Sequence, residues 1–166
     1  MENKSKAAEE DLWAFSGELV KRYIEVPVTE LRKIDPNHLN LGMRYAWISS
    51  DLLYKAGEMF DVFTLNCYAM TPDFDAINTI AQKCNKPTMI GEFHFGALDR
   101  GMTATGLKAV RTQKDRGLAY RYYVEQGAAN PNFLGAHYFI LNDQSLLGRF
   151  DGENYQIGLV DVAQTP

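Results

Sequence analysis

The sequence is poor in the residues that build metal centres and disulfide frameworks. Its 166 residues include two cysteines and three histidines. Cys67 and Cys84 lack the close spacing of a metal-binding pair, and two cysteines do not make a disulfide scaffold. We therefore expect two free thiols, no metal site and no cofactor.

The sequence also lacks a strong positive charge, a long apolar run and an apolar leader. Its formal net charge is −4, so no basic field favours nucleic acid or an anionic membrane surface. No apolar run reaches the roughly 20 residues of a membrane-spanning helix. The first residues, MENKSKAAEED, contain no apolar signal core. We expect a soluble protein with no nucleic-acid or membrane partner, and the sequence leaves its localisation unknown.

What the chain does contain is an amphipathic pattern near its start. Apolar residues recur there at three- and four-residue steps, namely Leu12, Phe15, Leu19, Tyr23 and Val26. This spacing gathers them on one face and predicts a helix over 9–33. Pro27 falls inside the pattern and should kink or interrupt that helix.

Three strand–helix units and a last strand follow this helix. We assign the units to 38–60, 61–85 and 86–128, the last strand to 133–141 and a C-terminal loop to 142–166. Mostly apolar strands joined by helices predict a parallel sheet covered by helices on its outer side. The chain, 1–166, is therefore expected to be a single α/β domain.

Two architectures fit this order of elements, a doubly wound open sheet and part of a (β/α)8 barrel. A dinucleotide fold would carry a glycine fingerprint after its first strand, and LGMRYAW lacks one. Strand and helix spacing alone does not separate the two architectures. In the tail, the charged stretch GRFDGEN is typical of a solvated loop.

Polar and aromatic side chains lie where the predicted strands end. In parallel α/β folds the chemistry gathers beyond these carboxyl ends. The candidates are Arg44, Asn66, Tyr68, Glu92, His94, His137 and Tyr138. Such a set suits a polyol pocket, because aromatic rings stack on sugar faces while charged and amide groups bind hydroxyls. Each residue also has a structural alternative; Glu92, for example, can simply pair with Arg44.

Several stretches of the chain resemble a known family. The most specific are IGEFHFGA and GRFDGENYQIGLVD, and DPNHLNLGMRYA, DVFTLNCYA and FLGAHYFILNDQS support them. Together they resemble the C-terminal half of clan A retaining glycoside hydrolases, in particular β-agarase and β-galactosidase-like enzymes. The resemblance runs from about Leu12 to Val162. It implies a (β/α)8 barrel in which the predicted strands are the fifth through eighth, so that the chain forms half a barrel.

The resemblance implies chemical roles for three residues. Glu92 would be the nucleophile that attacks the anomeric carbon and forms a covalent glycosyl-enzyme. Tyr68 would contact this nucleophile or the sugar. Arg44 would orient Glu92 or keep it ionised, because a nearby cation favours the charged form.

The other strand-end residues would bind substrate, a β-galactan or agar-type polysaccharide or oligosaccharide. Asn66, His94 and His137 would contact sugar hydroxyls, with His94 on the same face as Glu92 because strand side chains alternate. Tyr138 stands where the clan usually places a tryptophan beneath the reacting sugar.

The same resemblance implies that part of the site is missing. A complete (β/α)8 barrel needs about 250 residues, and the family's acid/base glutamate follows an asparagine at the end of strand four. No Asn-Glu pair precedes the first predicted strand, whereas retaining hydrolysis needs two carboxyl groups about 5–5.5 Å apart. Uncovered strand edges also invite association. We therefore expect a homodimer that closes the barrel, or completion by a separate N-terminal half-barrel.

Two other interpretations stay open. The chain could be a non-catalytic carbohydrate-binding or assembly module that uses the same rim. It could also be an unrelated small α/β protein in which Glu92 is structural. Whether the single chain is an enzyme is therefore left open; an active form would be a glycosidase.

Overall fold

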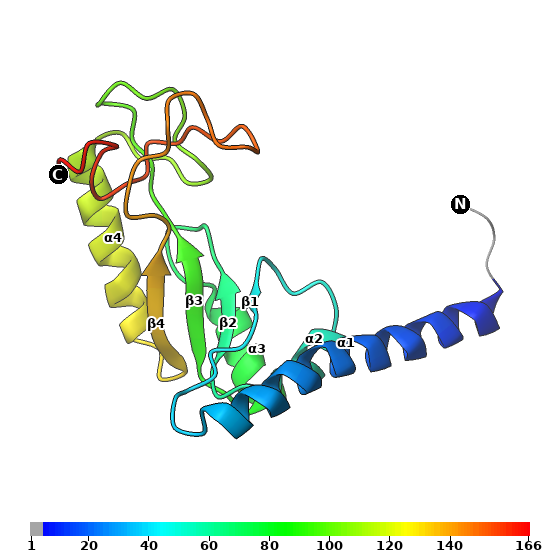
Figure 1. Ribbon diagram of the computed structural model, residues 1–166. Coiled ribbons are helices and arrows are strands. Elements are labelled where there is room, and N and C mark those ends of the chain that lie inside the picture. Colours follow the sequence, from blue (N-terminus) through cyan, green and yellow to red (C-terminus); the bar gives the residue numbers. More distant parts are fainter. Residues whose placement is uncertain (1–4) are drawn as a thin grey trace.

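The structure is a computed structural model that describes residues 5–166. The order of its elements is α1 (Lys6–Ile34), β1 (Arg44–Tyr45), α2 (Leu52–Gly57), β2 (Phe63–Asn66), α3 (Phe74–Cys84), β3 (Thr88–Phe93), α4 (Gln113–Ala128) and β4 (Phe133–Tyr138). The strands form one parallel sheet in the order β1-β2-β3-β4 (Figure 1). This confirms the predicted α/β half-barrel of four parallel strands with helices. Residues 1–4 of the predicted domain and leader region lie outside the described part.

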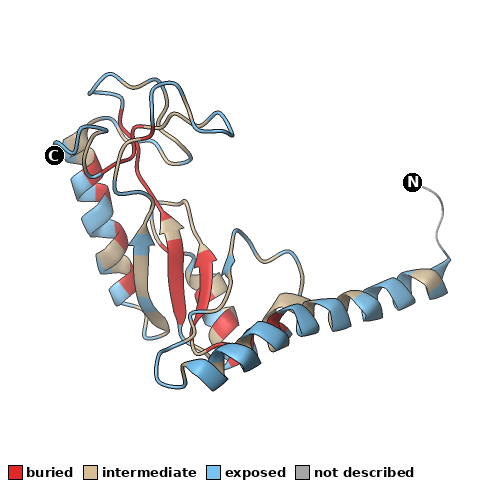
Figure 2. Cartoon of the chain, viewed as in Figure 1, coloured by how far each residue is buried: buried red, intermediate tan, exposed pale blue. Residues whose placement is uncertain are grey.

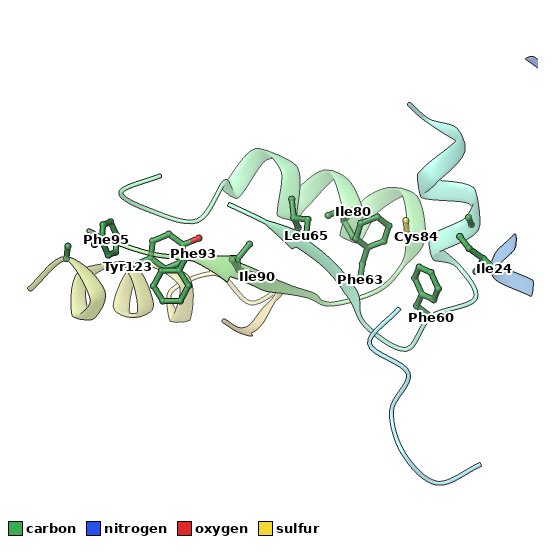
Figure 3. Packing of buried hydrophobic residues seen from close by; sticks show 12 residues of the cluster. Ile24, Phe60, Phe63, Leu65, Ile80, Cys84, Ile90, Phe93, Phe95 and Tyr123 are labelled. Atoms are coloured by element: carbon green, nitrogen blue, oxygen red, sulfur yellow. The ribbon is translucent and has the colours of Figure 1, made fainter. Parts of the chain in front are cut away.

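The main core lies between the sheet and helices α3 and α4 (Figures 2 and 3). Its aromatic centre is Phe93, whose ring is fully buried and stacks on Tyr123 of α4 at a centroid distance of 4.2 Å. Other members come from several elements and include Phe63, Leu65, Ile80, Cys84, Ile90 and Phe95. This packing anchors β2 and β3, the central strands, and so places their carboxyl ends.

Local signals set where two of the helices begin. Asp73 precedes α3, and its side chain accepts a hydrogen bond from the Ala76 N–H at 2.9 Å. Thr112 does the same for α4, where the Asp115 N–H donates at 3.1 Å. Such caps satisfy backbone donors that the first helical turn leaves free. Helix α3 accordingly begins at Phe74, directly after Asp73.

Helix α1 differs from the prediction and from the rest of the fold. It runs without interruption through Pro27 for 29 residues. Of the two predicted effects of Pro27, a kink or an interruption, the interruption is wrong. A proline removes a single intrahelical hydrogen bond, and the rest of so long a ladder remains available. Among the residues of α1 only Ile24 is buried, and the helix extends away from the sheet (Figures 1 and 2). None of the helices in residues 5–166 is long and apolar enough to cross a membrane.

Two predicted strands are shorter in the structure. The strand of the 38–60 unit is reduced to Arg44–Tyr45, and the last strand ends at Tyr138. Both are the outer strands of the sheet, and within the described residues each has a strand partner on one side only.

Candidate active site

A β-bulge in β3 determines where Glu92 points. Leu65 of β2 pairs with Ile90, but the next residue, Asn66, pairs with Glu92, so that Gly91 is an extra residue in β3. Simple alternation would put Glu92 on the helix-covered side with Ile90. The extra residue instead turns Glu92 to the face of Asn66, and Phe93 returns to the core. Bulges re-aim side chains in this way and are common beside active sites.

Both carboxylate oxygens of Glu92 have partners. A guanidinium nitrogen of Arg44, Nη2, lies 3.0 Å from Oε1, and the Tyr68 hydroxyl donates a short hydrogen bond to Oε2. The Glu92 side chain is mostly covered, whereas that of Arg44 is half exposed. The structure therefore brings together three predicted residues, one from each of β1 and β3 and one just beyond β2, at the carboxyl end of the sheet.

Tyr68 acts as a fixed hydrogen-bond donor in this cluster. Burial, the hydrogen bond to Glu92 and the charges of Glu92 and Glu153 raise the pKa of Tyr68 far above its usual range. The phenol therefore stays protonated at any physiological pH. A protonated phenol and a guanidinium together hold one carboxylate in a single orientation.

His94 lies next to this cluster, but its ring is buried and its Nε2 atom is occupied. Nε2 accepts a hydrogen bond from the Leu107 N–H at 2.8 Å, and the ring centroid lies 4.6 Å from that of Tyr68. Burial, helped by the positive charge of Arg116, lowers the pKa of His94 to about 4. The neutral ring therefore carries its proton on Nδ1, and it holds the loop around Leu107 against Tyr68.

The remaining predicted residues have different surroundings. Asn66 is the strand neighbour of Glu92, and its buried Oδ1 has no hydrogen-bond partner in the part of the chain that the structure describes. His137 is exposed on β4. Tyr138 packs edge-on against Phe93, and its hydroxyl donates to the Phe95 carbonyl at 3.1 Å. Tyr138 therefore lies on the helix-covered side, and its contact with sugar stays a prediction.

The aromatic residue that lies near His94 at the end of β4 is Phe139, one position beyond Tyr138. Its ring centroid lies 6.3 Å from that of His94, and the Arg149 guanidinium lies 5.8 Å from its centre. The alternation of side chains along a strand predicts that Tyr138 and Phe139 lie on different sides, because adjacent residues point to opposite faces. The predicted residue, Tyr138, is adjacent to Phe139, and a difference of one residue along a strand reverses the face.

From the sequence, the charged stretch around Arg149 was predicted to be a solvated loop. In the structure, Arg149 pairs with Asp151 and lies 3.1 Å from Glu153, whose carboxylate also accepts from Gln144 at 2.8 Å. The hydrogen bond to Asp151, with weaker contributions from the charges of Glu153, Asp151 and Glu92, raises the pKa of Arg149. The loops over 94–112 and 142–166 lie beyond the carboxyl ends of β3 and β4 (Figure 1). This stretch is therefore within electrostatic reach of Glu92.

The described residues do not assemble a metal centre. In residues 5–166 no group of three or more histidine, cysteine, aspartate or glutamate side chains is placed to hold a metal ion. Cys67 and Cys84 are both free thiols. What the rim offers is a held carboxylate surrounded by hydrogen-bonding and aromatic side chains.

Comparison with known proteins gives the class of this half-barrel. No family model matches the chain. It is 37% identical to β-agarase B of Vibrio sp. (strain JT0107) over 151 residues, 89% of this chain and 16% of that enzyme. It is 39% identical to β-agarase A of the same strain, over 95% of this chain and 17% of that enzyme. A crystal structure of an agarase, AgWH50C, matches with a TM-score of 0.87 and 37% identity, covering 98% of this chain and 24% of that one.

The half-barrel is thus glycoside-hydrolase-like. More narrowly, the chain is similar to a segment of the β-agarases, which confirms the predicted resemblance. The chain spans about a sixth of the length of the curated relatives that it matches.

Proposed function

We propose that this half-barrel carries the nucleophile of a retaining glycosidase site for an agar-type polysaccharide or a related β-galactan. The observation that carries the proposal is the double support of Glu92 by Arg44 and Tyr68 at the carboxyl end of β3. The names of the similar enzymes, β-agarases, support the substrate class.

In the proposed reaction, an oxygen of Glu92 forms a bond with the anomeric carbon of the sugar. The bond between that carbon and the glycosidic oxygen breaks, and its electron pair leaves with the oxygen, which takes a proton from a general acid. Water then attacks the same carbon while the base form of that acid takes its proton, and the bond between the carbon and Glu92 breaks. Arg44 and Tyr68 keep the attacking carboxylate oriented throughout.

We infer that the general acid comes from outside this set of residues. The charge of Glu153 helps to raise the pKa of Tyr68. Its carboxylate, however, pairs with Arg149 and accepts a hydrogen bond from Gln144. It is therefore poorly suited to protonate a leaving group. A retaining site needs its second carboxyl group about 5–5.5 Å from the nucleophile, and a second half-barrel is its expected source.

We propose that a second set of strands completes the barrel, from a second copy of the chain or from a separate N-terminal half-barrel. The outer strands β1 and β4 each offer an unpaired edge within the described sheet. Helix α1 offers an exposed apolar face with Phe15, Leu19 and Tyr23. Between α1 and the segment leading into β1 lies a mostly apolar cavity of about 590 Å³. Unpaired edges and apolar faces of this kind favour association.

Light scattering on a sizing column tests whether the second half-barrel is another copy of the chain. We expect the mass of a dimer, and we expect Leu19→Glu in α1 to shift it toward the monomer. Leu118→Glu in α4 is the matched control, because Leu19 and Leu118 are 57% and 58% exposed. A well-folded monomer at all concentrations would exclude self-pairing and leave the separate half-barrel as the complement.

Hydrolysis of agar oligosaccharides by the completed assembly tests the catalytic role. Glu92→Gln should lower the rate by about 10⁴-fold or more, because a missing nucleophile removes the covalent route. Glu153→Gln should have a much smaller effect. If both variants bind the oligosaccharide and neither they nor the parent hydrolyses it, the rim belongs to a binding module. If no sugar raises the melting temperature, the rim has no sugar ligand.

A further inference from the structure

Gly91, the residue before Glu92, lies directly under the side chain of Arg44. A Cβ atom built on Gly91 would stand 2.5 Å from Cδ of Arg44 and closer still to its Cγ. It would also stand 2.7 Å from Cγ2 of Thr64. The aliphatic part of Arg44 therefore crosses the Cα of Gly91 before its guanidinium reaches Glu92.

This close approach cannot be relieved by a small adjustment. The atoms nearest to the added Cβ belong to the middle of the Arg44 side chain, so the whole chain has to move rather than its tip. Thr64, on the next strand, is almost fully buried and its hydroxyl donates to the Leu41 carbonyl at 2.7 Å. Arg44 is the half-exposed neighbour, and it is the side that would yield.

We propose that Gly91 is a positioning residue: its missing side chain leaves the space through which Arg44 reaches Glu92. The same residue forms the bulge that turns Glu92 toward Arg44. Gly91 thus acts twice on one ion pair, through the direction of the carboxylate and through the path of the cation. The consequence for catalysis rests on the proposed role of Glu92 as nucleophile, whereas the geometric claim does not.

Gly135 provides a matched control in the same sheet. It lies in β4, and a Cβ built on it would meet no atom within 4 Å. Gly91→Ala and Gly135→Ala therefore make the same chemical change in two strands, one crowded by Arg44 and one open.

The test is side-chain NMR of the 166-residue protein, which needs neither sugar nor catalysis. We expect Gly91→Ala to move the guanidinium signals of Arg44 and the carboxyl carbon signal of Glu92, as Arg44→Ala moves the latter. Gly135→Ala should leave both in place. Unchanged Arg44 and Glu92 signals in Gly91→Ala would overturn the proposal.

A double variant separates positioning from general damage. With Arg44→Ala already present, Gly91→Ala should produce no further shift of the Glu92 signal, because the two changes act through one pair. Alone, Gly91→Ala should lower the melting temperature by roughly 3–10 °C, as overpacking does. With Arg44→Ala already present the loss should be clearly smaller, because only the close contact with Thr64 remains. An equal loss in both backgrounds, or a double variant that does not fold, would show that Arg44 is not the obstacle and would overturn the proposal.

A failure of these NMR and melting tests would leave the proposed function standing, since Glu92 could act without this arrangement. Conversely, an inactive assembly with the expected NMR shifts would count against the proposed function alone. The two claims are therefore tested separately.

Discussion

The two central strands and helix α1 use their apolar residues in opposite ways. In β2 and β3, residues such as Phe63, Ile90 and Phe93 are fully buried in the core. In α1, which is exposed over most of its length (Figure 2), the apolar residues Phe15 and Tyr23 are mostly exposed. Their spacing is nevertheless that of a helix with one buried face.

This contrast separates the side chains that stabilise the half-barrel itself from those that would stabilise its contact with a partner. A helix gains most of its stability from burying its apolar face rather than from intrinsic propensity. Helix α1 therefore exposes an apolar face that the described fold does not bury. Changes in the core should lower the free energy of unfolding, whereas changes on the exposed face of α1 should act on association.

The largest expected effect comes from the core. Phe93→Ala should lower the free energy of unfolding by about 3–5 kcal/mol, because it empties a buried site that stacks on Tyr123. Phe15→Ala, on the exposed face of α1, should change the unfolding of the monomer by less than about 0.5 kcal/mol. Urea titrations followed by circular dichroism measure both, and equal losses would contradict the contrast.

The next effect is a loss of stability in acid through His94. The folded state keeps this buried ring neutral, with a pKa of about 4, whereas the unfolded chain binds a proton near the ordinary value of 6.5. As the pH falls from about 7 to 4, the unfolded state therefore gains a proton that the folded state does not. The free energy of unfolding should fall by an amount on the order of 3 kcal/mol over this window.

A His94→Gln variant isolates this contribution. Glutamine can still accept the Leu107 N–H but does not titrate, so its urea midpoint should depend less steeply on pH between 7 and 4 than that of the parent. Parallel pH profiles for the two proteins would mean that other groups set the acid response.

The smallest expected effects come from removing the caps of two helices. Asp73→Ala removes the cap of α3, which packs on the core, and should cost about 1 kcal/mol in unfolding. Ser5 caps α1 in the same way, accepting from the Ala8 N–H at 3.2 Å. Because this end of α1 is exposed, Ser5→Ala should fray the first turn without changing global unfolding. Hydrogen exchange of the first amides of each helix checks both, and a global loss from Ser5→Ala would show that α1 unfolds with the core.

Much of the fold was predictable from local patterns. The 61–85 unit predicted a strand followed by a helix, as β2 and α3 are, and the apolar run before Glu92 placed this residue at the carboxyl end of a strand. That Arg44 and Glu92 share one rim also followed, because the ends of parallel strands lie at one edge of a sheet. The contact of Tyr68 with Glu92 was implied by the family resemblance. Agreement between these signals is what makes such predictions succeed.

Other features depended on contacts between distant parts of the chain. Pro27 suggested a kink or an interruption, and the helix α1 runs through it without a break. Nor did the local sequence show that Phe139, next to the predicted Tyr138, lies near His94. The cluster of Arg149 with Asp151 and Glu153 looked like an ordinary charged loop, because nothing in its local sequence states that it folds back toward Tyr68.

By itself, the sequence determined the order of strands and helices and placed a glutamate at the end of β3, because periodicity and capping are local properties. The tertiary structure alone decided that Gly91 forms a bulge, that Glu92 turns toward Arg44 and that Arg44 passes over a glycine to meet it. Strand register depends on pairing with neighbours far along the chain, and a shift of one residue reverses the face on which a side chain lies.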